Sequence, residues 1–238
     1  METKPSLGVL LLDTVFPRIP GDVGNVHSYE YPVVLRTVPG ATVQRVVYEA
    51  DSGLLSDFIQ AAQALENQGV VAITSSCGFL SVFQEAVAKS VRIPVFLSSL
   101  LQVPLAHAMT QKPVGIITAH SERLTKEVLS RAGVSDKIPH AVGGLQNSSA
   151  FSDPILKDGR NLQRDAIAKD VIDIATSLIR GNPDIGTFVF ECHNLAPYSH
   201  AVQQATGLPV YDIVDFANWV YSTVNKRSYP SHTETTTA

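Results

Sequence analysis

The chain has 238 residues, of which 45% are hydrophobic and 17% are charged, and its formal net charge is −4. This composition describes a globular protein with a substantial core, long enough for one large domain or two smaller ones. The acidic balance argues against a nucleic-acid partner, and no basic cluster opposes that conclusion. The apolar runs are short and interrupted, so we expect no membrane span and no membrane partner.

The chain start and its cysteine content suggest a compartment. No hydrophobic signal-peptide core follows Met1, and the whole chain contains only two cysteines. We therefore expect reduced thiols and a cytoplasmic location, although a disulfide between the two cysteines is an open alternative. Residues 228–238 are rich in Ser and Thr, and we expect them to form a disordered tail.

Apolar runs alternate with amphipathic segments along the chain, which predicts an α/β fold with parallel sheets. Continuous apolar runs predict buried strands at residues 7–12, 43–48, 69–73, 94–97, 114–119, 140–145, 185–190 and 210–213. Apolar residues at helical spacing predict helices at residues 54–67, 79–90, 98–109, 121–133, 159–180, 197–206 and 216–224. We expect residues 1–109 and 209–227 to form a first domain and residues 110–208 a second.

The two cysteines occupy matching positions in an internal repeat. An offset of 115 residues places Cys77 on Cys192 and the proline-containing run 93–96 on the run 208–211. Two generic strand–helix–strand units would also share apolar positions, but the common cysteine and proline register favours a true duplication. The two cysteines should then occupy equivalent places on facing domains.

Each cysteine follows an apolar strand, at the strand-to-helix position where α/β proteins bind ligands. A helix N-terminus favours a thiolate and offers backbone N–H groups to an anion. A thiolate–thiol pair formed by Cys77 and Cys192 can remove a proton from a carbon and deliver one to its opposite face. The alternative is that both cysteines are buried structural residues, which is usual for one isolated cysteine.

Several residues near the cysteines are candidates for substrate binding, with ordinary helix capping as the alternative for the polar ones. His193 is also a candidate to tune the Cys192 thiolate, and Glu191 is a candidate acid/base partner. His193 and His200 match no common zinc spacing, so we expect no metal site. The substrate-binding candidates are Ser75, Ser76, Gly78, Phe79, Thr118, His193, Asn194, Asp13 and Asn25.

Two of these candidates, Asp13 and Asn25, lie in a long segment that follows the first strand, residues 13–25. Long loops in compact domains are usually functional or disordered, and the apolar and aromatic residues of this one favour an ordered loop. We expect it to cover the active site, and a surface loop held by its prolines is the alternative.

The paired cysteines, the duplicated halves and the run Phe16-Pro17-Arg18-Ile19-Pro20-Gly21-Asp22-Val23-Gly24-Asn25 make the chain resemble the aspartate/glutamate racemase superfamily. The resemblance covers about residues 7–224, and the superfamily includes hydantoin racemases, maleate isomerases and arylmalonate decarboxylases. It implies two pseudo-symmetric Rossmann-like domains, an active site in the interdomain cleft, no cofactor and a homodimer. It also implies that Cys77 and Cys192 are the acid/base residues, each serving one face of an α-carbon.

The residues after each cysteine depart from the amino-acid racemases of that superfamily. Those enzymes usually have Asn-Thr after the first cysteine, where this chain has Gly78-Phe79. After the second they usually have Thr-Glu or Thr-His, where this chain has His193-Asn194. Aspartate or glutamate as the substrate therefore does not carry over. The Cys-Gly-Phe run is similar to that of the algal dimethylsulfoniopropionate lyases, which use α-proton removal to drive a β-elimination.

Three functions follow from these features. The leading hypothesis is a cofactor-independent racemase or epimerase that transfers a proton at a carbon α to the carboxylate of a small substrate. The alternative is a lyase or decarboxylase of the same superfamily, with β-elimination as in the dimethylsulfoniopropionate lyases. A third interpretation is a non-catalytic small-molecule binding protein, which also has two α/β lobes around a cleft but leaves the thiols unexplained.

Overall fold

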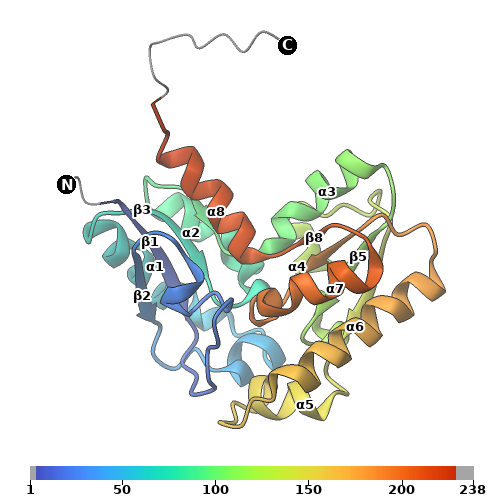
Figure 1. Cartoon of the computed structure of the whole chain (residues 1–238). Helices are drawn as coiled ribbons and strands as arrows, with labels where there is room; N and C mark the ends of the chain where they lie inside the picture. Colours follow the sequence, from blue (N-terminus) through green and yellow to red (C-terminus); the bar gives the residue numbers. More distant parts are fainter. Residues whose placement is uncertain (1–3, 229–238) are drawn as a thin grey trace, which may run out of the picture.

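Two lobes, each built on one parallel sheet, make up the protein (Figure 1). The computed structural model describes residues 4–228. The strand order is β2-β1-β3-β4 in the first sheet and β6-β5-β7-β8 in the second, and every strand pair is parallel. The two orders are equivalent, which confirms the predicted α/β fold with two pseudo-symmetric, Rossmann-like halves.

The strands and helices alternate, as the hydrophobic pattern predicted. The strands are β1 (Ser6–Leu11), β2 (Val33–Thr37), β3 (Val70–Ser75), β4 (Val95–Phe96), β5 (Val114–Thr118), β6 (His140–Gly144), β7 (Thr187–Phe190) and β8 (Val210–Tyr211). The α-helices are α1 (Leu55–Asn67), α2 (Gln84–Ser90), α3 (Val103–Thr110), α4 (Lys126–Arg131), α5 (Ser149–Phe151), α6 (Arg164–Gly181), α7 (Ser199–Thr206) and α8 (Ile213–Val224).

One predicted strand is wrong. Residues Gln44–Tyr48 form a helical turn, and the second strand is β2, which the sequence did not predict. The physical reason is periodicity: Val43, Val46 and Val47 are buried at the i, i+3, i+4 spacing of a helix. Strand β2 lies at the edge of its sheet and is only partly buried, so its apolar signal is weak.

The segments after the two cysteines fold in the same way. Each begins with a short 3₁₀ helix, η4 (Gly78–Phe83) in the first lobe and η8 (His193–Tyr198) in the second, and each continues into an α-helix. Cys77 and Cys192 are the N-cap residues of these two 3₁₀ helices. The shared local structure agrees with the internal repeat and gives the two thiols equivalent positions.

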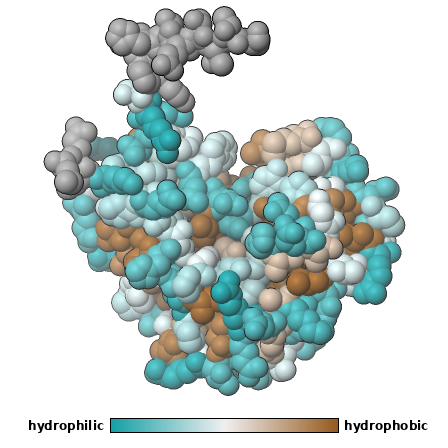
Figure 2. Space-filling model, in the orientation of Figure 1, coloured by the Kyte–Doolittle hydropathy of each residue, from teal (hydrophilic) through white to brown (hydrophobic). Residues whose placement is uncertain are grey.

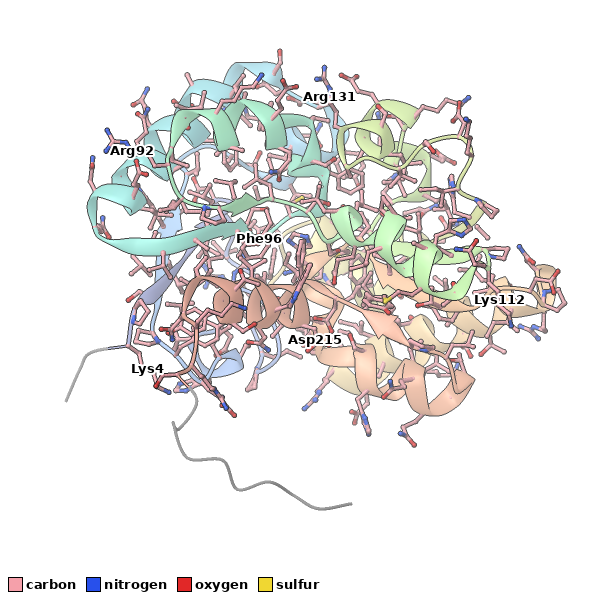
Figure 3. All side chains as sticks on the ribbon, turned by 90° about the horizontal axis from the view of Figure 1, so that it is seen from above. Lys4, Arg92, Phe96, Lys112, Arg131 and Asp215 are labelled. Atoms are coloured by element: carbon pink, nitrogen blue, oxygen red, sulfur yellow. The ribbon has the colours of Figure 1, made fainter. Side chains whose placement is uncertain are left out.

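Helix α8 returns from the second lobe to the first. The Tyr221 hydroxyl donates a hydrogen bond of 2.9 Å to the Pro5 carbonyl, and the Phe216 ring packs 5.0 Å from that of Phe96. Figure 3 shows Phe96 within the first lobe and Asp215, at the start of α8, close to the boundary between lobes. Strand β8 pairs with β7 in the second sheet, so the chain crosses over between β8 and α8. The exact division into two domains stays a prediction.

One face of the molecule is largely polar (Figure 2). Hydrophilic residues cover most of the face in Figure 2, and hydrophobic residues form small separate patches there. Arg92, Arg131 and Lys112 lie at the periphery in Figure 3. Across residues 4–228, no helix combines the length and apolar character that spanning a membrane requires. Apart from Ser228, the predicted disordered tail lies outside the described residues.

Candidate active site

Cys77 and Cys192 line one small cavity to which both lobes contribute. Each cysteine follows the carboxyl end of a central strand, β3 or β7, which is where ligands bind in open α/β sheets. Both thiols are free, so the structure does not contain the alternative disulfide. The volume of the cavity is about 20 Å³. Apolar side chains enclose much of the space, among them Leu12, Phe16, Val47, Phe79, Ile155 and Leu156.

Burial raises the pKa of both thiols above its ordinary value, and nearby Glu191 raises it further. We expected a helix N-terminus to lower these pKa values, and this expectation is wrong because desolvation outweighs the backbone N–H groups. Because an ordinary thiol pKa already lies above neutral pH and both values are raised, both cysteines are thiols at neutral pH in this structure.

The two thiols have different surroundings. Two backbone N–H groups and the guanidinium of Arg18 lower the pKa of Cys77 against the effect of burial. At Cys192 a single backbone N–H, that of Asn194, lowers the pKa of the thiol, whereas the nearby Asp22 raises it. Cys77 is thus the thiol whose anion the surrounding groups stabilise better.

Glu191 is fully buried beside both thiols. Its Oε2 accepts a 2.6 Å hydrogen bond from the Thr118 hydroxyl, whereas its buried Oε1 has no hydrogen-bond partner among residues 4–228. Burial raises the pKa of Glu191 to about 7, against the lowering effect of hydrogen bonds from Thr118 and the Ala119 backbone. A substantial share of Glu191 is therefore a neutral carboxylic acid near neutral pH.

His193 connects the lobes. Its Nδ1 lies 2.7 Å from the Ser75 carbonyl oxygen, and its Nε2 accepts a 3.1 Å hydrogen bond from the Ser99 backbone N–H. Burial lowers the pKa of His193 to about 4, so the ring is neutral and donates from Nδ1. Both ring nitrogens form hydrogen bonds with the backbone of the first lobe. Neither nitrogen is therefore available to interact with the Cys192 thiol and change its pKa.

The loop of residues 13–25 brings side chains of the first lobe against the second. The backbone N–H groups of Val15 and Phe16 donate to Asp158 Oδ1 at 2.7 and 3.1 Å. The Asn194 side chain donates to Asp22 Oδ2 at 2.7 Å. The loop contributes Phe16 and Arg18 to the cavity lining, which is consistent with the expected covering role.

The predicted site residues fall into two groups. Five of the substrate-binding candidates line the cavity with the cysteines: Ser76, Gly78, Phe79, His193 and Asn194. Four lie outside the lining and form hydrogen bonds within the protein. The Ser75 hydroxyl donates to the Leu97 carbonyl and the Thr118 hydroxyl to Glu191, the Asp13 carboxylate accepts from the Gly40 N–H, and the Asn25 amide donates to the Arg18 carbonyl. Roles in substrate binding stay predictions for all nine.

Arg18 and Asp22 were not among the sequence candidates, although the run that contains them was recognised. An arginine in a loop is ordinarily expected to lie on the surface, in contact with solvent. The available signal was the spacing of Arg18, Asp22 and Gly24 within one ordered loop. As for metals, within residues 4–228 no group of three or more His, Cys, Asp or Glu side chains is placed to hold an ion.

Comparison with curated proteins gives the family. A dimethylsulfoniopropionate lyase from Durusdinium sp. clade D is 35% identical over 226 residues, covering 90% of this chain and 73% of that protein. The chain belongs to the dimethylsulfoniopropionate lyase family. Dimethylsulfoniopropionate lyase 3 of Emiliania huxleyi is also 35% identical, over 231 residues, and here the match covers 90% of this chain but 58% of the relative. No family model matches the chain.

Solved structures confirm the fold. Arylmalonate decarboxylase gives a TM-score of 0.65 at 13% identity, with 94% of each chain covered. A glutamate racemase from Bacillus anthracis gives 0.62 at 15% identity, covering 93% of this chain and 82% of that one. An aspartate racemase from Picrophilus torridus gives 0.59 at 10% identity, covering 94% and 96%. The predicted likeness to dimethylsulfoniopropionate lyases is confirmed by the curated relatives, and the chain shares the fold of arylmalonate decarboxylase and of the aspartate and glutamate racemases, as the resemblance implied. The protein is an enzyme.

Proposed function

We propose that this enzyme is a lyase that removes a proton α to a carboxylate and expels a β substituent, with dimethylsulfoniopropionate as its substrate. One observation carries the proposal: two free thiols at equivalent positions line one cavity in a member of the dimethylsulfoniopropionate lyase family. We therefore prefer the lyase alternative to the racemase hypothesis, because the curated relatives are named dimethylsulfoniopropionate lyases.

The reaction needs one base. A thiolate takes a proton from the carbon next to the carboxylate, and the electron pair of that C–H bond forms a double bond to the β carbon. The bond from the β carbon to sulfur breaks, and dimethyl sulfide leaves with the bonding electrons. The products are dimethyl sulfide and acrylate, and the proton stays on the thiol. Because the leaving group is neutral, no second proton transfer is required.

Cys77 is the better candidate for this base. The Arg18 guanidinium and two backbone N–H groups favour its anion, whereas the environment of Cys192 includes Asp22. The substrate also carries a sulfonium cation, and a positive charge enclosed beside a buried thiol lowers the pKa of that thiol. Binding of this cation would therefore favour the Cys77 thiolate.

Cys192 and Glu191 would then support the carbanion. Both groups lie near Cys77, and each carries a proton when neutral. A thiol or a carboxylic acid can donate a hydrogen bond to the oxygen on which negative charge develops as the α proton leaves. The unpaired Oε1 of Glu191 offers such a position.

The test is to incubate the protein with dimethylsulfoniopropionate, measure dimethyl sulfide in the headspace and quantify acrylate by NMR. Equal amounts of both products would establish the lyase. A racemase would instead release no fragment and would exchange the α-hydrogen of a chiral amino acid or hydantoin in D₂O. A binding protein would do neither, and its ligand affinity would survive cysteine-to-serine substitution. The homodimer and the cytoplasmic location stay predictions.

A further inference from the structure

The loop of residues 13–25 places one arginine, Arg18, on the cavity that contains the two thiols. We propose that Arg18 binds the carboxylate of the substrate and that the rest of this loop holds its guanidinium in position. The inference rests on the proposed function, because it assigns one group of the same substrate class to one residue.

Charge and burial both favour a carboxylate ligand. The Arg18 side chain is 13% exposed, and it is the one arginine or lysine among the cavity-lining residues of the described chain. The planar fork of a guanidinium matches a carboxylate and can donate two parallel hydrogen bonds to it. A small carboxylate that entered this cavity would meet its opposite charge at Arg18.

The partners of Arg18 leave part of its guanidinium free. Its Nη1 donates to Asp22 Oδ1 at 3.0 Å and its Nη2 donates to Thr14 Oγ1 at 3.2 Å, which accounts for two of five N–H groups. Asp22 has other partners too, because its Oδ1 accepts from the Gly24 N–H and its Oδ2 accepts from Asn194. Asp22 therefore holds the guanidinium from one side and keeps the loop against the second lobe.

Other residues of the run also contact Arg18. A Cβ on Gly24 would lie 2.5 Å from Arg18 Cδ and 2.8 Å from Nε, so only glycine lets the guanidinium lie there. The Asn25 side chain donates to the Arg18 carbonyl at 2.7 Å, and the Phe16 ring lies 4.8 Å from Arg18 Cζ. Five residues of one loop thus position the backbone and side chain of a single arginine: Thr14, Phe16, Asp22, Gly24 and Asn25.

The test compares dimethylsulfoniopropionate with its methyl ester, which keeps the sulfonium and loses the negative charge. Truncating one partner of a buried, hydrogen-bonded charge pair reduces affinity by about 30-fold or more. We expect Arg18→Gln to lower the acid-to-ester ratio of kcat/KM by at least about this factor, mainly through a higher KM for the acid. The intrinsic difference in reactivity between acid and ester cancels when the two proteins are compared.

Arg45→Gln is the matched control. Arg45 belongs to the same lobe and forms an ion pair of 2.7 Å with Asp51, but it does not line the cavity. Its loss should leave the acid-to-ester ratio unchanged. Because Arg18→Gln leaves Asp22 buried without its cation, the double variant Arg18→Gln with Asp22→Asn provides a charge-balanced version if the single variant does not fold. An acid-to-ester ratio equal to that of the wild type in either folded variant would overturn the inference.

A binding measurement separates this inference from the proposed function. Propionate should bind the wild-type protein by NMR titration more tightly than propionamide does, and Arg18→Gln should remove that preference. If the wild type releases no dimethyl sulfide but shows this Arg18-dependent preference, the lyase proposal fails and the carboxylate site stands. If the wild type cleaves dimethylsulfoniopropionate and propionate binds equally well to Arg18→Gln, the lyase stands and the carboxylate site fails.

Discussion

Gly78 lies directly against Glu191: a Cβ on Gly78 would overlap both the backbone oxygen and the Oε1 atom of Glu191. The backbone of Gly78 is not in the left-handed region, so its conformation does not require a glycine. The glycine is required because there is no room for a side chain. The amino-acid racemases that the chain resembles usually have asparagine at this place. In this protein the same volume is occupied by the end of strand β7, which brings a buried carboxyl group beside the two thiols.

Gly78→Ala should therefore destabilise the protein. Overpacking of this kind costs about 1–3 kcal/mol in the free energy of unfolding, which urea denaturation at pH 7 would measure. Adding Glu191→Ala should not restore stability, because the backbone oxygen stays in place. Gly181→Ala is the control, since no atom lies within 4 Å of a Cβ there. A Gly78→Ala protein as stable as the wild type would refute the tight contact.

Glu191 should make stability depend on pH. Burial raises its pKa from 4.5 to about 7, so the folded state binds more protons than the unfolded state between these values. The stabilisation is fully present below pH 4.5 and is lost as the pH rises through 7, with a total change of about 3 kcal/mol. Glu191→Gln carries no titrating group at this position, so its free energy of unfolding should not show this decrease as the pH rises.

The comparison is the difference in unfolding free energy between wild type and Glu191→Gln at pH 5 and pH 8. Other groups, including Asp212, whose pKa burial also raises, are present in both proteins and largely cancel. We expect the stability of the variant relative to the wild type to increase by about 2.5 kcal/mol between pH 5 and pH 8. A difference that does not change with pH would mean that Glu191 is not a buried acid with a raised pKa.

Asp158 should control how firmly the loop of residues 13–25 is held. Its Oδ1 accepts the hydrogen bonds from Val15 and Phe16, and Asp158 itself has a left-handed backbone with φ of 55°. Asp158→Ala removes the acceptor and should raise KM for dimethylsulfoniopropionate by about fivefold, which corresponds to about 1 kcal/mol. Asp158→Asn keeps an Oδ1 and tolerates the backbone conformation, so its KM should stay near the wild-type value. Equal KM values for the two variants would show that the acceptor atom does not matter.

The fold could be predicted from the sequence because its strands are continuous apolar runs and its helices have clear apolar stripes. The failure at Gln44–Tyr48 came from three valines whose helical spacing was taken for a strand. The edge strand β2 (Val33–Thr37) escaped detection because it has no fully buried face to leave a periodic signal. Tertiary pairing, which is absent from the local sequence, decides such a strand.

The site was predicted in part. The cysteines could be found because the duplication places them in register, and the structure puts both on one cavity. Arg18 was missed, although the run that contains it was recognised, because its burial depends on Asp22, which is fixed in turn by Asn194 of the other lobe. The thiol pKa values were misjudged for a similar reason. A helix N-terminus can be read from sequence, whereas desolvation and the approach of Glu191 arise only when the lobes meet.

The most direct test of the proposed chemistry is the rate of dimethyl sulfide release by Cys77→Ala and by Cys192→Ala, with folding of each checked by circular dichroism. Loss of a general base costs about 10²–10⁴-fold in rate. We expect Cys77→Ala to lose activity by about this factor and Cys192→Ala to lose about tenfold, the value of one weaker hydrogen bond. If both variants release dimethyl sulfide at the wild-type rate, the thiols take no part in the reaction and the mechanism is wrong.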